Sequence, residues 1–173
     1  KVENNNNVYN FSYDIYGNRT ATSVGNTTLI DYLFNDNNGK LNSVVYGNGA
    51  TVTYTYDKLN RVREINKGND YLYRYTYDKK GNISSLFDNF QNKTIRYAYD
   101  SIGRLVSSKA SNGFGMYQNY DAYNRINKLT YTFGSDSLTY RYNYNPKNLI
   151  GSVTLPTGKT LTNTYNGLNM LKS

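Results

Sequence analysis

Acidic side chains are the groups of this chain that could do chemistry, because the sequence contains no His and no Cys. The commonest general base and the thiol nucleophile are therefore missing. A pair of carboxylates could still act, as it does in glycoside hydrolysis. A catalytic pair is not expected in every copy of a repeat, however, and the Asp residues recur. We therefore predict a non-enzymatic chain whose carboxylates stabilise turns, at Asp14, Asp36, Asp57, Asp78, Asp100 and Asp121.

Two short motifs resemble ion-binding loops, but each lacks an essential part. The segment Asp36-Asn37-Asn38-Gly39 is similar to the start of a calcium loop. The bidentate Glu that such a loop needs at about its twelfth position is absent. The segment Gly47-Asn48-Gly49 opens no helix and therefore forms no phosphate loop. We predict neither a metal nor a cofactor.

Tyr and Arg alternate in two segments, Tyr73-Arg74-Tyr75 and Tyr140-Arg141-Tyr142. Aromatic rings beside Arg could stack on sugars or bind an acidic glycan, so a glycan-binding adhesin is the alternative function. Neighbouring side chains of a strand point to opposite faces of the sheet, however. In the competing interpretation, the rings pack on one face and the Arg side chains are solvated on the other.

The Asp residues mark a repeat that organises the chain. With the Asn that replaces Asp in the last two copies, the markers are Asp14, Asp36, Asp57, Asp78, Asp100, Asp121, Asn145 and Asn166. The intervals between them are 22, 21, 21, 22, 21, 24 and 21 residues. A fixed period in this range is typical of arrays in which each supersecondary unit stacks on its neighbours. We predict a single array of about eight units over residues 1–173.

Each unit has the pattern of one β-hairpin when positions are numbered from its marker. Large side chains fall at −1, −3 and −5 and polar ones between them, as in Tyr54-Thr55-Tyr56. This period of two is typical of a strand with one packed face. Apolar residues at both +5 and +8 break the alternation in the return strand, which predicts a β-bulge at +8. The sequence thus predicts an all-β fold of tandem hairpins, each about 21 residues long, in a curved antiparallel sheet strip.

Position +3 of each unit is restricted to Gly or Asn. These residues tolerate a left-handed backbone better than others do. The restriction predicts one turn geometry throughout, at Gly17, Gly39, Asn60, Gly81, Gly103, Asn124, Asn148 and Asn169.

Charge and hydropathy limit the classes of partner that the chain can bind. The net charge is +8 at pH 7, but the basic residues are spread along the chain without a run of five, which argues against nucleic acid. No apolar run approaches the ~20 residues of a membrane-spanning helix. The outermost strands of an open sheet are unpaired, so we expect edges on which copies of the chain can associate.

The segment Tyr97–Leu105 reads Tyr-Ala-Tyr-Asp-Ser-Ile-Gly-Arg-Leu, and Tyr54–Asp57 and Tyr75–Asp78 repeat its first half. It resembles the YD repeat of the Rhs family, which is similar to wall-associated toxins, insecticidal toxin complex C components and teneurins. The resemblance implies a β-sheet shell around the protein's own C-terminal toxin or other cargo, secreted or at the bacterial cell surface. Because no Asp-Pro-x-Gly cleavage motif and no unrelated C-terminal domain is found, we expect a wall segment of a longer protein.

Overall fold

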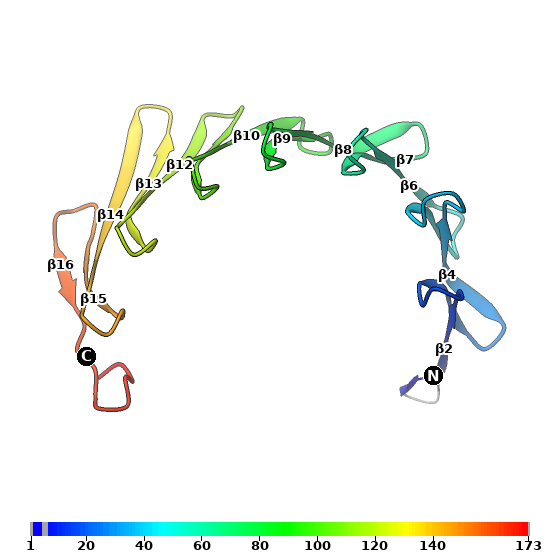
Figure 1. The fold of residues 1–173 in the computed structure, drawn as a ribbon, viewed down its shortest axis with the longest axis horizontal. Coiled ribbons are helices and arrows are strands. Elements are labelled where there is room, and N and C mark those ends of the chain that lie inside the picture. Colours follow the sequence, from blue (N-terminus) through cyan, green and yellow to red (C-terminus); the bar gives the residue numbers. More distant parts are fainter. Residues whose placement is uncertain (1, 5–6, 173) are drawn as a thin grey trace. The chain divides into compact units, whose positions relative to one another are not determined.

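Strands fill the chain because large and polar residues alternate along most of it. The computed structural model describes residues 2–4 and 7–172, and within them it has sixteen β-strands and no helix (Figure 1). Neighbouring strands pair antiparallel, as in β2 with β3 and β12 with β13. The predicted all-β fold of tandem hairpins is confirmed.

The chain divides into two compact units, each described by itself. The first extends to Thr76 and includes Leu86–Asn92, and the second contains Tyr77–Ser85 and the chain from Lys93 onward. The strands of the first unit are β1 (Val2–Asn4), β2 (Asn7–Tyr13), β3 (Arg19–Val24), β4 (Thr27–Phe34), β5 (Leu41–Tyr46), β6 (Thr51–Tyr56), β7 (Val62–Lys67) and, apart from its last residue, β8 (Asp70–Tyr77). Those of the second are β10 (Lys93–Tyr99), β11 (Leu105–Ala110), β12 (Phe114–Tyr120), β13 (Ile126–Phe133), β14 (Asp136–Tyr144), β15 (Ile150–Thr154) and β16 (Thr160–Thr162). Strand β9 (Ile83–Asp88) contributes residues to both units.

Strands within each unit follow the sequence order, so each strand pairs with the next one along the chain. The marker turns connect one set of strand ends, for example between β6 and β7. Links with a left-handed Gly, such as Gly68 between β7 and β8, connect the opposite ends. All marker turns of a unit therefore lie along one edge of its sheet, which is called the turn edge below.

A bulge lies in the return strand, two residues before the predicted position. Tyr56 pairs with Val62 and Thr55 with Glu64, so Arg63 at +6 has no partner in the ladder. Tyr54 then pairs with Ile65, which brings the residues at +5 and +8 onto the same face as the −1 and −3 rings. The break in alternation at +8 is thus the consequence of an extra residue at +6.

The second hairpin departs from the predicted register. Phe34 pairs with Leu41 and Tyr32 with Val44, as −1 pairs with +5 and −3 with +8 in the other hairpins. The −1 position is therefore Phe34 rather than Asn35, and Leu33 lies on the opposite face, 50% exposed. One additional residue in this turn shifts the incoming strand relative to Asp36, which explains why counting back from that Asp assigned the wrong face.

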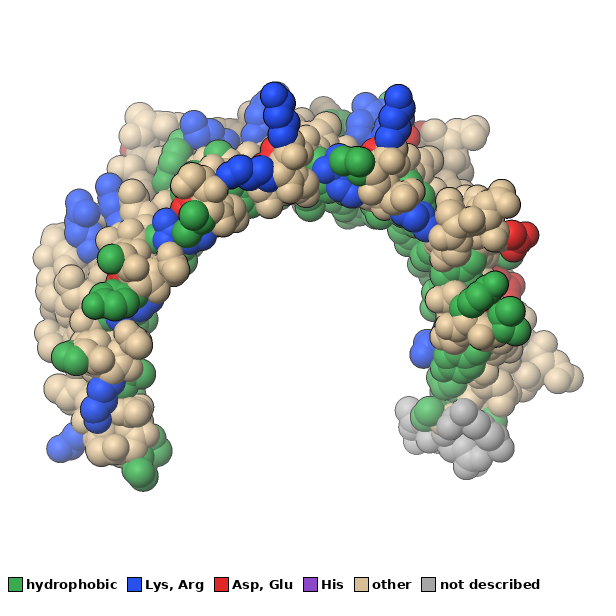
Figure 2. Space-filling model, viewed as in Figure 1, with side chains coloured by type: hydrophobic (Ala, Val, Ile, Leu, Met, Phe, Trp, Pro, Cys, Tyr) green, Lys and Arg blue, Asp and Glu red, His purple; other side chains and the backbone are tan. Residues whose placement is uncertain are grey.

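Each unit is a single layer of strands with little enclosed core. Hydrophobic side chains gather along one face, called the ring face, and many Lys and Arg side chains project from the opposite one (Figure 2). Among the described residues, Val44 is the only deeply buried hydrophobic residue, at 5% exposure. The accessible surface is 12132 Å², whereas a globular monomer of this mass has about 8,600 Å². The fold therefore leaves a broad, half-covered aromatic surface.

Candidate functional site

The marker side chain closes its turn by accepting backbone N–H groups. Asp100 Oδ1 accepts the N–H of Ile102 at 3.0 Å and that of Arg104 at 2.9 Å. Backbone bonds complete the turn, since Asp100 N donates to Arg104 O at 2.9 Å and Gly103 N to Asp100 O at 3.1 Å. Equivalent side-chain bonds are accepted by Asp14, Asp57, Asp78, Asp121, Asn145 and Asn166. The same atoms that could act as bases are engaged in turn structure.

The protonation of these carboxylates does not suit acid catalysis. A side-chain hydrogen bond from Arg61 lowers the pKa of Asp57, and bonds from Asn18 and Asn82 lower the pKa of Asp14 and Asp78. Partial burial works in the other direction at Asp100 and Asp121, but hydrogen bonds from Arg104 and Arg125 outweigh it and lower the pKa of both. A general acid needs a raised pKa to hold its proton at neutral pH. These groups remain ionised.

The second turn uses a different capping residue from the one predicted. Asn35 Oδ1, not a carboxylate oxygen of Asp36, accepts the N–H of Asn37 at 2.9 Å. Gly39 N donates to Asn35 O at 2.8 Å, and Asn35 N donates to Lys40 O at 2.8 Å. Asp36 is an exposed residue inside the longer turn. The extra residue that shifts the hairpin register is thus accommodated between the cap at Asn35 and the left-handed Gly39.

The +3 residues share a left-handed backbone. Their φ angles run from +62° at Asn169 to +93° at Gly81. Gly17, Gly39 and Gly103 have φ values of +82°, +66° and +89°, and Asn60, Asn124 and Asn148 have values of 63° to 66°. An L-residue with a β-carbon is strained there, and Asn tolerates the conformation best because its short side chain can bond locally.

Consecutive turns are connected through the cation at +4. Arg104 Nε donates to its own cap, Asp100 Oδ2, at 2.6 Å, and its Nη1 donates to Asn124 Oδ1 of the next turn at 2.7 Å. The guanidinium carbon lies 4.3 Å from the centre of the Tyr120 ring at the next −1 position. Arg125 makes the same three contacts with Asp121, Asn148 and Tyr144. We call this set of contacts, from a +4 cation to the next −1 ring and +3 residue, the seam.

A tyrosine hydroxyl reinforces the seam. Tyr144 at −1 donates to the carbonyl of Ile126, the +5 residue of the preceding hairpin, at 2.8 Å. The same bond joins Tyr56 to Leu41, Tyr99 to Ile83, Tyr120 to Leu105 and Tyr165 to Ile150. The sequence pattern placed the −1 rings on the packed face but did not identify the carbonyl that their hydroxyl groups bond. The regular occurrence of Tyr rather than Phe at −1 is the signal that pointed to a hydroxyl function.

Lysine replaces arginine at two points of the turn edge. Lys40 Nζ donates to Asn60 O at 2.6 Å and lies 4.8 Å from the centre of the Tyr56 ring. Lys80, at +2 rather than +4, donates to Ser101 O of the next turn at 2.6 Å. Basic residues of four turns, Lys40, Lys80, Arg104 and Arg125, therefore link copies of the repeat.

The Tyr–Arg segments proposed for glycan contact do not converge on one surface. Tyr73 pairs with Ile65 on the ring face, whereas Arg74 pairs with Glu64 on the other face. There Arg74 Nε lies 3.3 Å from Glu64 Oε1, and its guanidinium stacks 4.1 Å from the Tyr71 ring centre. Tyr75 follows the alternation back to the ring face.

The second Tyr–Arg segment has the same alternation. The Tyr140 ring packs edge-on against Tyr131 with a centroid separation of 6.5 Å. Tyr142 pairs with Val153 on the ring face. Desolvation by the surrounding ring face raises the pKa of Tyr142. Arg141 pairs with Lys128 and Thr154 on the other face and is exposed.

Neither a cluster of potential metal ligands nor a helix long enough to cross a bilayer is found in the described parts of the chain. No group of three or more acidic, His or Cys side chains is placed to hold a metal ion in residues 2–4 and 7–172. The same residues include no helix with the length and apolar character needed to cross a bilayer.

A family model described as the teneurin YD-shell matches residues 2–88, which is 87 of the 173 residues. The chain belongs to the teneurin YD-shell family. The marker turns and the seam are thus structural elements of a YD-shell chain whose hairpins are about 21 residues long. No curated protein matches the chain.

Solved structures share the fold of this YD-shell chain. The crystal structure of TcdB2-TccC3 matches with a TM-score of 0.69 and 15% identity over 96% of this chain and 11% of that one. The crystal structure of TcdB2-TccC3 without its hypervariable C-terminal region matches with a TM-score of 0.69 and 17% identity, over 96% of this chain and 11% of that one. The structure of a Photorhabdus luminescens Tc holotoxin pore matches with a TM-score of 0.62 and 15% identity, over 95% of this chain and 12% of that one. The chain thus spans about a ninth of the length of these proteins. At identities of 15% to 17%, the match shows a common fold and nothing more.

Proposed function

We propose that this YD-shell chain is a non-catalytic wall segment that encloses a C-terminal toxin or other cargo of its parent protein. The parent is a secreted or cell-surface protein of a bacterium. The seam is the observation that supports this most directly, because side-chain contacts of Lys40, Arg104 and Arg125 join one hairpin to the next at three places along the turn edge. A wall needs such repeat-to-repeat contacts, and repeat arrays gain much of their stability from them.

The exposed surface supports the same function. The chain exposes 12132 Å², roughly 3,500 Å² more than a globular monomer of its mass. The ring face is only half buried, and within each unit no second layer of described residues covers it. We propose that this face contacts the cargo, because an incompletely folded chain presents apolar groups that half-buried Tyr rings can accommodate. The opposite, Lys- and Arg-rich face would then be directed to solvent.

We also propose that this segment catalyses no reaction. The carboxylates that cap turns, those of Asp14, Asp57, Asp78, Asp100 and Asp121, are engaged in hydrogen bonds that lower their pKa. The function of this segment is then steric: it separates the cargo from proteases while the number of repeats sets the extent of the wall. We propose that the array is continuous from the first marker to the last.

Limited proteolysis of the parent protein tests the shell function. The C-terminal region should be cleaved much more slowly within the parent than when it is expressed alone. Equal cleavage rates in the two contexts would refute enclosure.

Two matched deletions make the test specific for the wall. Removal of residues 100–120 takes out one 21-residue period and keeps the register of the remaining hairpins, so protection should persist. Removal of residues 100–109 destroys one hairpin and displaces the side-chain faces that follow, so protection should be lost. If both deletions behave alike, the repeat register does not determine protection.

Glycan binding by the Tyr–Arg segments is the alternative function. The variant Tyr75→Leu/Tyr142→Leu keeps apolar side chains on the ring face. Loss of retention on a glycan matrix, with the fold intact by NMR, would support an adhesin. If the variant loses both its fold and its retention on the glycan matrix, the two tyrosines belong to the scaffold.

A further inference from the structure

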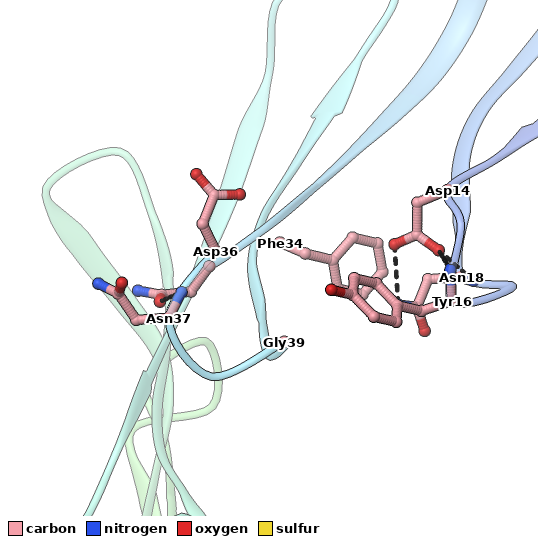
Figure 3. Close-up of a pocket in the computed structure, with 8 residues that line it drawn as sticks. Asp14, Tyr16, Asn18, Phe34, Asp36, Asn37 and Gly39 are labelled. Carbon is pink, nitrogen blue, oxygen red and sulfur yellow. Dashed lines mark hydrogen bonds between the residues drawn. The ribbon is translucent and has the colours of Figure 1, made fainter.

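A pocket of about 510 Å³ opens on the turn edge between the first and second marker turns (Figure 3). The first turn contributes Asp14, Tyr16 and Asn18. The second hairpin contributes Phe34, Asn35, Asp36, Asn37 and Gly39. Figure 3 shows the rings of Tyr16 and Phe34 between the two turns, with the carboxyl group of Asp14 beside Tyr16. All these residues belong to the first compact unit.

The pocket lies where the seam is incomplete. At the turns capped by Asp100 and Asp121, the space between the cap and the next −1 ring holds the guanidinium group of Arg104 or Arg125. The +4 residue of the first turn is Asn18, whose short side chain donates to Asp14 Oδ2 at 2.9 Å. The next −1 residue is Phe34, which has no hydroxyl to bond the preceding hairpin. Both groups that occupy the space elsewhere are therefore replaced by smaller ones.

The walls of the pocket are acidic and aromatic. Asp36 is exposed, is free of the capping role and lines the pocket with Asp14. An adjoining hollow of about 410 Å³ shares Asp14, Phe34 and Asp36 and adds Asp31. These carboxylates stand out in a chain with a net charge of +8.

The nearby cations are directed elsewhere. Lys40 Nζ donates to Asn60 O toward the third turn. The Arg19 guanidinium lies 4.5 Å from the centre of the Phe11 ring. Neither residue lines the pocket, so the acidic walls have no cationic counterpart of the kind that Arg104 supplies to Asp100.

We propose that this pocket binds an arginine side chain presented by another polypeptide segment. The incoming guanidinium would take the place that Arg104 and Arg125 occupy at the Asp100 and Asp121 turns. Asp14 Oδ2 supplies a charged acceptor, Asp36 and the amide oxygen of Asn37 supply further acceptors, and the rings of Phe34 and Tyr16 supply cation–π contacts. Arg suits this geometry better than Lys, because its planar fork bonds several acceptors while stacking on a ring.

The chain itself provides the template for this ligand. Arg125 combines an ion pair with Asp121 at 2.6 Å, a hydrogen bond to Asn148 and a ring contact at 4.2 Å. Sugars also bind between rings and carboxylates, but a neutral ligand would leave the charge of Asp14 and Asp36 unbalanced. The guanidinium is therefore favoured over a glycan.

Amide ¹H–¹⁵N NMR titration of the 173-residue chain tests the proposal. The probe is acetyl-Gly-Arg-Gly-amide, and its control is the same peptide with citrulline, which has nearly the same shape without the charge. The Arg peptide should shift the amides of Tyr16, Asn18 and Gly39. Citrulline should bind at least about fivefold more weakly, because charge-assisted hydrogen bonds are roughly twice as strong as neutral ones. Added salt should weaken the Arg peptide selectively.

Two variants and a matched control locate the site. Asp36→Asn should weaken binding without affecting the turn, and Asp136→Asn, a change of the same kind away from the pocket, should leave binding unchanged. Asn18→Arg supplies the missing seam cation within the chain, so it should abolish binding. The other amide signals should keep the dispersion of the folded chain.

Three outcomes would overturn the proposal: no shift at the pocket amides with the Arg peptide, equal binding of the citrulline peptide, or binding that survives Asn18→Arg. A shift of the same amides by an oligosaccharide alone would assign the pocket to a glycan instead. The measurement is made on the isolated chain, so its failure would leave the shell function untouched.

Discussion

Arg125 and Tyr144 should be energetically coupled, because the guanidinium of one lies 4.2 Å from the ring centre of the other across the seam. The perturbation is a double-mutant cycle with Arg125→Gln, Tyr144→Leu and the combined variant. The guanidinium side chain is only 23% exposed, so a cation–π term of about 1 kcal/mol is expected rather than the smaller value of an open surface. The loss of the Tyr144 hydroxyl bond to Ile126 O cancels within the cycle.

Native-state amide hydrogen exchange gives the coupling free energy locally, which suits an array whose repeats can open separately. The amide of Asn145 is a direct reporter, since it donates to Leu149 O at 2.8 Å in the seventh turn. A coupling of 1 kcal/mol corresponds to about a fivefold difference in opening equilibrium beyond the product of the single effects.

The matched control pairs Tyr144→Leu with Arg141→Gln, because Arg141 is exposed on the opposite face. That pair should be additive within error. Additive behaviour of Arg125 and Tyr144 would refute the seam as a source of cohesion between hairpins. Equal coupling in both pairs would show that general charge effects, not the stacked geometry, are being measured.

Three further predictions follow from the turn edge. Tyr165→Phe removes the 2.9 Å bond to Ile150 O and should cost about 0.5–1.5 kcal/mol in urea unfolding, whereas the same change at Tyr123, which is 75% exposed, should have almost no effect. Asn60 has φ = +66°, so Asn60→Gly should be nearly neutral and Asn60→Val should destabilise by about 1–2 kcal/mol in the same assay. The lowered pKa of Asp57 stabilises the fold at pH values above the unfolded pKa of about 3.9, and this contribution is lost as pH falls through the folded pKa. The urea midpoint should therefore drop on acidification, and Asp57→Asn should flatten that drop; an unchanged pH profile would contradict the role of the carboxylate.

Much of the fold could be predicted from the sequence because it is governed by local interactions. The alternation in Tyr54-Thr55-Tyr56 is a local pattern that indicates a strand with one packed face. The restriction of +3 to Gly or Asn reflects a backbone conformation that one residue adopts by itself, as at Gly103 with φ = +89°. Each marker needs only N–H groups two and four residues later, so Asp100 and its turn form one short segment.

The errors of sequence reasoning arose where two segments must be aligned with each other. Counting from Asp36 could not reveal that the cap is Asn35, because the extra residue is located only by the pairing of Phe34 with Leu41. Similarly, an apolar residue at +8 indicates a break in alternation, but the ladder assigns the unpaired residue to Arg63 at +6.

The sequence by itself determined the repeat, the hairpins and the left-handed +3 position of the turns, because each depends on residues within one period. Only the tertiary structure decided how one hairpin is joined to the next. Contacts such as Arg104 with Asn124 and Tyr144 with Ile126 connect residues about one period apart, and their partners depend on how neighbouring strands are aligned. The pocket between Asp14 and Phe34 exists for the same reason: it is the space left where a contact between two repeats is not made.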